Sequence, residues 1–328
     1  MNEAKVDVGM PTRGAAPYLE QAIESVLAQT EPDWSLFISE NGPGELEDRV
    51  EPFLSDERVR FSPTGEDLGA ARNHTRLLEA GTAPYVAILH DDDRWDPEWL
   101  ARRVDFLERH PECGFVFGGN REIDGESRVT ASSELVLAEG VHQPEEIVPL
   151  LVRHNIVGIP TVLARRSAYE AVGPEFTEET VSFDYEMWLR LALRFPVGYL
   201  AVRDADYRVH GSQVTMTNRK RGEDQIRLIE RIRALVAERP GIPTDERVLR
   251  RRLAGAHLSA ALDALQDPDR KGARRHLQVA LQEYPASALD PRAAGVAAGF
   301  VLGRRGRHAL QRARHLVLRK GLRVHLRR

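Results

Sequence analysis

The residues with the clearest capacity for chemistry are four consecutive polar side chains in LHDDDRW: His90, Asp91, Asp92 and Asp93. They directly follow the apolar run YVAIL, which is typical of a buried strand. Three adjacent carboxylates repel one another unless water or a cation relieves the repulsion, and hard oxygen ligands favour Mg²⁺ or Mn²⁺. The run therefore predicts a divalent-cation site, with a solvated acidic turn as the alternative. Asp96, just beyond it, is expected to be the N-cap of the next helix.

Two further carboxylates lie where elements are expected to end or begin. Glu40 ends the apolar run WSLFIS beside an Asn-Gly turn, where it could accept hydrogen bonds from a base or ribose. Asp184 falls in the first turn of a helix expected to begin near Ser182. Each has a structural alternative, because Glu40 suits an ordinary turn and a carboxylate is favourable at a helix N-terminus.

Two basic side chains complete the set of candidates. Arg72 lies in the first turn of a helix that begins within LGAARN, where a cation opposes the helix dipole and needs a partner. That partner is either a ligand phosphate or one of the nearby acids Glu66 and Asp67. His210, in YRVHGSQVT, follows a strand-like segment and is either a ligand or a surface loop histidine.

Several classes of protein are excluded. The sequence contains neither G-x-G-x-x-G nor G-x-x-x-x-G-K-[ST], so a nucleotide would not bind through either of those loops. Its single cysteine, Cys113, excludes an internal disulfide framework and a multi-cysteine zinc site. No apolar run reaches the roughly 18 residues of a membrane-spanning helix. The first residues lack the layout of a signal peptide, which predicts a cytoplasmic location.

The elements that must position these side chains alternate over the first two hundred residues. Pro17 to Gln29 and Leu68 to Ala80 have one apolar face each and are expected as helices. Short apolar runs are expected as strands covered on both faces: Val6 to Met10, Trp34 to Ser39, Tyr85 to Leu89 and Gly114 to Phe117. This alternation predicts an α/β fold with a mostly parallel sheet flanked by helices.

After about Met216 only helical patterns remain. They cover Arg219 to Arg239, Asp245 to Leu265 and Asp269 to Tyr284. We therefore expect three regions in the chain: an α/β domain (1–218), a helical region (219–302) and a basic amphipathic helix (303–328).

Charge is strongly segregated along the chain. The formal net charge is −4, but residues 304–328 hold ten Lys or Arg and no acid, so the remainder carries 36 basic against 50 acidic side chains. Apolar residues at helical spacing in this segment predict an in-plane helix on an anionic membrane surface. A helix folded against the acidic remainder is the alternative. Nucleic acid is not an expected partner, because the segment has no aromatic residue to stack on bases.

Six segments, in this order and spacing, resemble the family 2 glycosyltransferases of the GT-A fold. They are VDVGMPTRGAAPYLEQAIESVLAQT, SENGP, LGAARN, LHDDDRW, FDYEMWLRLAL and YRVHGSQVT. The resemblance spans roughly Val6 to Thr215. It implies a GT-A-type, mostly parallel sheet in residues 1–218 and a metal-dependent glycosyltransferase activity.

The resemblance implies that five positions outside the acidic run bind the nucleotide-sugar donor. Pro11 and Thr12 would lie in the loop that contacts a uracil-type base, and Glu40 would take the place of the carboxylate that binds the nucleoside. Arg72 would lie near the base or the diphosphate, and His210 near the diphosphate. At position 40 the side chain is one methylene longer than the usual Asp.

The same resemblance implies the metal ligand and the catalytic base. Asp92 matches the second acid of the D-x-D motif and would hold Mn²⁺ or Mg²⁺, whereas Asp184 matches the general base. The chain departs from the pattern at His90, where the first acid usually stands, so the ribose contact would fall to Asp91. It also has Phe183 where an acid often precedes the base.

These roles predict an inverting transfer of a sugar from a nucleoside diphosphate donor, expected to be UDP, to an acceptor hydroxyl in cell-surface glycan or glycolipid synthesis. A nucleotidyltransferase would need a glycine-rich basic loop after the first strand, which PTRGAAPYL lacks. A non-catalytic nucleotide-sugar-binding scaffold remains the alternative. The predicted location is the cytoplasm, with peripheral attachment at the inner face of the cell membrane through residues 303–328.

Overall fold

The computed structural model of this chain describes residues 4–210, 221–266 and 269–300. It divides into two compact units, Met1–Gly211 and Ser212–Arg328, and each is described by itself. The predicted domain boundary at residue 218 and the predicted basic helix 303–328 lie outside the described residues.

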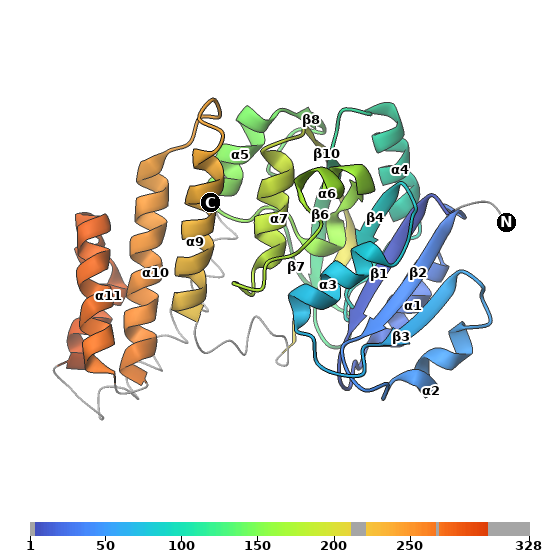
Figure 1. The fold of residues 1–328 in the computed structure, drawn as a ribbon, viewed down its shortest axis with the longest axis horizontal. Coiled ribbons are helices and arrows are strands. Elements are labelled where there is room, and N and C mark those ends of the chain that lie inside the picture. Colours follow the sequence, from blue (N-terminus) through green and yellow to red (C-terminus); the bar gives the residue numbers. More distant parts are fainter. Residues whose placement is uncertain (1–3, 211–220, 267–268, 301–328) are drawn as a thin grey trace. The chain divides into compact units, whose positions relative to one another are not determined.

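The first unit is built around one mixed sheet with the strand order β3-β2-β1-β4-β9-β6-β10-β5 (Figure 1). Beside this path, β7 pairs with β6 and β8 pairs with β10. The strands, in chain order, are β1 Val6–Thr12, β2 Trp34–Glu40, β3 Val59–Pro63, β4 Tyr85–Ile88, β5 Arg94–Trp95, β6 Phe115–Ile123, β7 Val129–Ser132, β8 Gly140–His142, β9 Leu163–Arg165 and β10 Val197–Arg208.

Six of these strands run in the same direction. β1, β2, β3 and β4 form parallel pairs, and β6 pairs in parallel with β10. β9 is antiparallel to both β4 and β6, so the two parallel groups share one direction. The predicted mostly parallel sheet is confirmed. The carboxyl ends of β1, β2, β4, β6 and β10 therefore lie at one edge, where open α/β sheets bind ligands.

Helices cover both faces of the parallel strands. β1 turns Val6, Val8 and Met10 toward one face, where they belong to one buried cluster with residues of α1 (Leu19–Leu27) and α4 (Trp99–Arg109). Gly9 lies on the opposite face, where a Cβ would come within 2.9 Å of the Cβ of Leu77 in α3 (Ala70–Glu79). A glycine at this position thus allows α3 to pack directly against β1.

The remaining elements of this unit surround the sheet. The helices are α2 Glu47–Val50, α5 Pro144–Arg153, α6 Arg166–Val172 and α7 Phe183–Ala192, with 3₁₀ turns at Glu51–Phe53 and Ile159–Thr161. In the second unit the predicted helical character is confirmed by α9 Arg221–Ala237, α10 Glu246–Gln266 and α11 Arg270–Glu283, followed by a 3₁₀ turn at Pro285–Leu289. Among the described residues, no helix is both long and apolar enough to cross a membrane.

The predicted N-cap of α4 is wrong. The helix begins at Trp99, and Glu98 is the cap residue, without a side-chain capping bond. The carboxylate of Asp96 instead accepts hydrogen bonds from the guanidinium of Arg121 in β6 at 2.6 and 3.2 Å. The charge-assisted hydrogen bonds from Arg121 thus use the carboxylate of Asp96, which local sequence preference alone would place as the helix cap.

Candidate active site

The predicted site residues from β1, β4 and β10 come together at the carboxyl edge of the sheet. Thr12, the last residue of β1, donates a hydrogen bond from Oγ1 to Oδ2 of Asp91, in the loop after β4, at 2.5 Å. Asp92, in the same loop, lies 2.9 Å from Nε2 of His210, which follows β10. Side chains separated by 79 and 118 positions in the sequence therefore share one place in the fold.

Asp91 is a carboxylate in a poorly solvated position. The pKa of Asp91 is raised to about 6, chiefly by burial; the hydrogen bond from Thr12 opposes this rise, and repulsion by Asp92 adds to it. A carboxyl group with this pKa exchanges its proton near neutral pH. It accepts a hydrogen bond from a hydroxyl when it is ionised and donates one when it is protonated.

Asp92 and His210 are the more accessible pair of the site. Each side chain is 18% exposed, so both are within reach of a ligand. The ring of His210 packs against that of Tyr18, with 5.7 Å between centroids, and Tyr18 carries the guanidinium of Arg208 over its face at 4.0 Å. Aromatic packing thus orients the histidine beside the carboxylate.

Arg208, the last residue of β10, holds the acidic loop (residues 90–93) in place, and it was not recognised in the sequence. Its side chain is fully buried and donates from Nε to the carbonyl oxygen of Asp92 at 2.8 Å. Its backbone N–H donates to Oδ1 of Asp93 at 2.9 Å. Arg208 lies two residues before His210, and residues two apart in an extended chain point to the same side. This spacing is the sequence signal that could have identified Arg208 as a site residue.

The donor set at this edge fits a divalent cation. Ligand atoms of His90, Asp92 and Asp93 lie within 4.8 Å of one another. Asp93 is completely buried, and its Oδ2 accepts no hydrogen bond from any residue in the described part of the chain. A buried carboxylate oxygen without a donor is costly, and a cation would satisfy it. The sequence predicted a cation site for this run as a whole, and the family resemblance assigned only Asp92 as its ligand.

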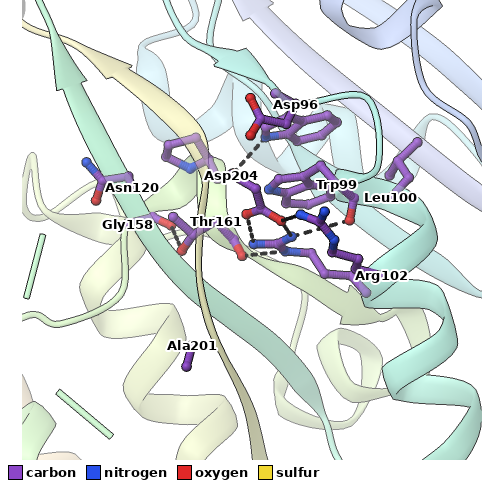
Figure 2. A network of polar contacts seen from close by, with 12 residues as sticks. Asp96, Trp99, Leu100, Arg102, Asn120, Gly158, Thr161, Ala201 and Asp204 are labelled. Atoms are coloured by element: carbon purple, nitrogen blue, oxygen red, sulfur yellow. Dashed lines mark hydrogen bonds and ion pairs between the residues drawn. The ribbon is translucent and has the colours of Figure 1, made fainter. Parts of the chain in front are cut away.

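The segment that follows the acidic loop is fastened to β10. Arg103 of α4 pairs with Asp204 through two hydrogen bonds of 2.9 Å, and both side chains are at most 1% exposed. The backbone carbonyl of Asp204 accepts a hydrogen bond from the N–H of Asp96 at 2.9 Å. Figure 2 shows Asp204 at the centre of this network, beside Trp99 and Thr161. These contacts anchor the acidic loop at its downstream end.

The residues predicted to contact the nucleoside lie side by side. In the parallel register of β1 and β2, Pro11 is opposite Ser39 and Thr12 is opposite Glu40. The carboxylate of Glu40 is buried and accepts backbone hydrogen bonds from residues 44–46 at 2.9–3.3 Å. Glu40 therefore shapes the turn after β2.

Arg72 has a different protein partner from those considered in the sequence analysis. It pairs with Glu178 at 3.6 Å, and both side chains are more than 60% exposed. Asp67 instead pairs with Arg13 at 2.6 Å. An exposed ion pair contributes little stability, so the guanidinium of Arg72 could exchange Glu178 for an anionic ligand at small cost.

Asp184 lies in the first turn of α7, as predicted. Burial raises the pKa of Asp184 to about 6, while hydrogen bonds from the backbone of Tyr185 and from the side chain of Asn155 lower it. The carboxylate is thus mostly ionised at pH 7 but more basic than an exposed aspartate, which suits a group that must take up a proton.

A chain of ring contacts connects the start of α7 to the acidic loop. Phe183, beside Asp184, packs edge-on against His74 of α3, with 4.8 Å between ring centroids. His74 is hydrogen-bonded in turn to His90, with 3.0 Å between their Nε2 atoms. No local pattern in the sequence predicts this pair, because the two histidines belong to different elements.

Comparison with known proteins places the chain in a family. The profile of glycosyl transferase family 2 matches residues 7–172, which hold the acidic loop and the strands from β1 to β9. The chain belongs to glycosyl transferase family 2. The matched region ends before Asp184 and His210.

Several relatives of this family 2 member carry transferase names. TuaG of Bacillus subtilis, named for teichuronic acid biosynthesis, is 29% identical over 166 residues, 49% of this chain and 62% of TuaG. The glucosyl-dolichyl phosphate glucuronosyltransferase of Haloferax volcanii is 33% identical over 117 residues, 35% of this chain and 37% of the relative. In both cases the matched region spans less than two thirds of the relative. The Escherichia coli UDP-Glc:alpha-D-GlcNAc-diphosphoundecaprenol beta-1,3-glucosyltransferase WfgD is 22% identical over 191 residues, 58% of this chain and 71% of WfgD.

Solved structures establish the GT-A fold. S. aureus TarS 1–349, in complex with UDP-GlcNAc, has a TM-score of 0.66 at 14% identity, covering 97% of this chain and 92% of that chain. The mannosyltransferase PcManGT of Pyrobaculum calidifontis, in complex with GDP-Man and Mn²⁺, has a TM-score of 0.55 at 17% identity, covering 94% and 84%. The predicted fold class is confirmed.

Proposed function

We propose that this family 2 member transfers a sugar from a UDP-linked donor to an acceptor hydroxyl, with inversion at the sugar carbon that is attacked. The observation that carries the proposal is the meeting of Asp92 and His210, 2.9 Å apart, beside the buried carboxylate of Asp93. This arrangement offers oxygen ligands for a cation and an imidazole for a phosphate oxygen at the sheet edge where ligands bind.

The leaving diphosphate is bound by the acidic loop and by His210. Asp92 and Asp93 would hold a divalent cation, and its chemistry there is to neutralise the negative charge that develops as the sugar departs. His210 hydrogen-bonds a phosphate oxygen, and Arg72 can turn from Glu178 toward the same charge. Asp91, positioned by Thr12, accepts a hydrogen bond from a ribose hydroxyl.

The nucleoside lies over the ends of β1 and β2. Pro11 and Thr12 contact the base, and Glu40 binds the nucleoside through the turn that it shapes. The choice of UDP is supported by the UDP-GlcNAc complex of TarS and by the UDP-Glc in the name of WfgD. PcManGT carries GDP-Man on the same fold, so the fold alone does not select the base.

Asp184 activates the acceptor. A hydroxyl is a weak nucleophile at neutral pH, so a carboxylate within hydrogen-bond reach must remove its proton as the bond to the sugar forms. The raised pKa of Asp184, about 6, increases its basicity for this step. One base that acts from the face opposite the diphosphate produces inversion.

Donor binding and turnover test the proposal. Thermal shift with UDP, GDP and their sugars, with and without Mn²⁺, should show the largest stabilisation with a UDP-sugar plus Mn²⁺, because only ligands of the native state raise the melting temperature. Metal-dependent hydrolysis of that donor then separates an enzyme from a scaffold that only binds it. Stabilisation by GDP-sugars alone would overturn the choice of UDP, and binding without turnover would favour the scaffold.

The acceptor is assigned to a cell-surface glycan or its lipid-linked precursor, on the names of TuaG and WfgD. The ten basic side chains of residues 304–328 would hold the enzyme at the anionic inner face of the membrane. Flotation with anionic and neutral liposomes compares the full chain with a truncation after Gly303. The full chain should float on anionic liposomes at low salt, and equal flotation of both forms would refute the membrane role.

A further inference from the structure

His74 of α3 and His90, the first residue of the acidic loop, form a hydrogen-bonded pair. His74 is 4% exposed, and its ring is enclosed by those of Phe176 and Phe183, with centroids at 5.7 and 4.8 Å. Its Nδ1 lies 2.8 Å from the carbonyl oxygen of Ala70, and its Nε2 lies 3.0 Å from Nε2 of His90. The proposed transfer assigns no role to these two rings.

Their hydrogen bonds determine where the protons lie. A carbonyl oxygen can only accept, so Nδ1 of His74 carries the proton that points to Ala70. A neutral imidazole has one N–H, which leaves Nε2 of His74 as an acceptor. Nε2 of His90 must then donate to it, and the lone pair of a neutral His90 falls on Nδ1. The relay from Ala70 through His74 therefore fixes the tautomer of His90.

His90 is also one of the three residues whose ligand atoms could hold a cation. Ligand atoms of His90, Asp92 and Asp93 lie within 4.8 Å of one another. Two ligands on opposite sides of one small divalent ion are about 4.2 Å apart, so modest side-chain rotation brings all three into a single coordination shell. The buried Oδ2 of Asp93, which receives no hydrogen bond from the described residues, is a second and independent sign of a missing positive partner.

We propose that Nδ1 of His90 is a direct ligand of the divalent cation together with Asp92 and Asp93, and that His74 is the positioning residue that holds His90 in the required tautomer. The inference rests on the proposed function only in taking a cation to bind at this edge. At position 90 the chain thus has a nitrogen ligand where the resemblance leads one to expect a carboxylate.

A nitrogen ligand changes the choice of metal. Imidazole binds transition metals far better than Mg²⁺, which prefers oxygen ligands. The site should therefore favour Mn²⁺ and Co²⁺ over Mg²⁺. Replacing the imidazole by a carboxylate in His90→Asp should move the preference back toward Mg²⁺.

Pulsed electron paramagnetic resonance of Mn²⁺ bound to the full-length protein tests the ligand directly. Coupling to ¹⁴N should be present in the wild type and should persist in His210→Ala, which removes the other histidine near Asp92. It should vanish in the double variant His90→Asp, His210→Ala, which still binds the ion. Loss of the coupling in His210→Ala alone, or failure of the wild type to bind Mn²⁺, would overturn the proposal.

The positioning role of His74 has its own readout. His74→Phe keeps an aromatic ring in the cluster but cannot accept the proton of His90, so Mn²⁺ affinity should fall about 10–100-fold. His74→Gln can accept that hydrogen bond and should recover part of the affinity. ¹⁵N chemical shifts should place the proton of His90 on Nε2 in the metal-free wild type, and a proton on Nδ1 would contradict the relay.

These measurements are independent of sugar transfer. Nitrogen coupling and the predicted tautomer in a protein that transfers no sugar would sustain the ligand assignment and refute the proposed function. Sugar transfer by a protein whose bound Mn²⁺ shows no ¹⁴N coupling would refute the ligand assignment and sustain the proposed function.

Discussion

Two regions of this domain each raise the pKa of an aspartate to about 6, but in different surroundings. Asp91 is surrounded by other polar groups, with the hydroxyl of Thr12 on it and the carboxylate of Asp92 beside it. Asp184 is raised by burial, with no other charged group among the causes of its shift. The first environment concentrates negative charge, whereas the second isolates one carboxylate.

The difference indicates a division of labour. Crowded carboxylates are stabilised by a cation, so the acidic loop suits the binding of a metal and a diphosphate. A single desolvated carboxylate at a helix start suits proton uptake. The acidic loop is also held in place by two buried arginines from other elements, Arg103 of α4 and Arg208 of β10.

The largest expected effect is the loss of turnover in Asp184→Asn, which separates proton uptake from donor binding. Asp184→Asn keeps the shape of the side chain but removes its basicity, so kcat should fall roughly 10²–10⁴-fold while donor affinity stays unchanged. Burial of the ionised carboxylate opposes folding above pH 6, so the variant should be at least as stable as the wild type. Steady-state kinetics, donor calorimetry and thermal unfolding check this. Near wild-type turnover would return Asp184 to a helix-start role.

A second variant addresses the support of the acidic loop. Arg103→Met leaves Asp204 without its bidentate partner and should lower the free energy of unfolding by about 3–5 kcal/mol. Arg109→Met, on the same helix, removes an exposed pair with Asp105 and should leave stability nearly unchanged. Urea unfolding compares the two. Equal effects would show that the buried pair is not a main anchor of the loop.

The smallest effect is the pH dependence of turnover. Because the pKa of Asp184 is raised to about 6, the base is ionised above that pH and is lost as the pH falls through it. At saturating donor, kcat should fall about tenfold between pH 7 and pH 5. The fall in kcat toward low pH should persist in an Asp92 variant and disappear in an Asp184 variant, because only the Asp184 variant lacks the base. A kcat that is flat down to pH 5 would contradict the assignment.

The order of elements could be predicted from the sequence because it depends on local patterns. The apolar run at 85–89 and the amphipathic stretch at 68–80 appear in the structure as β4 and α3, with ends shifted by one or two residues. The position of the site could be predicted from the parallel order, because Thr12 ends β1, the acidic loop follows β4, and these two strands are parallel.

The pairings within the site could not be predicted, because they join positions far apart in the chain. Asp96 accepts from Arg121 rather than capping α4, and Arg103 finds Asp204 about a hundred residues away. No periodicity or local preference encodes such contacts. His74 and His90 likewise become partners only when α3 packs beside the end of β4.

Calorimetry of UDP binding, with and without Mn²⁺, tests the division of roles most directly in the wild type and in Asp92→Ala. Asp92 lies in a partly exposed loop, so its removal should leave the fold intact. Mn²⁺ should tighten UDP binding by about tenfold or more in the wild type, a difference of at least about 1.4 kcal/mol, and should have no effect in the variant. A variant whose UDP affinity still rises with Mn²⁺ as in the wild type would show that Asp92 does not hold the metal.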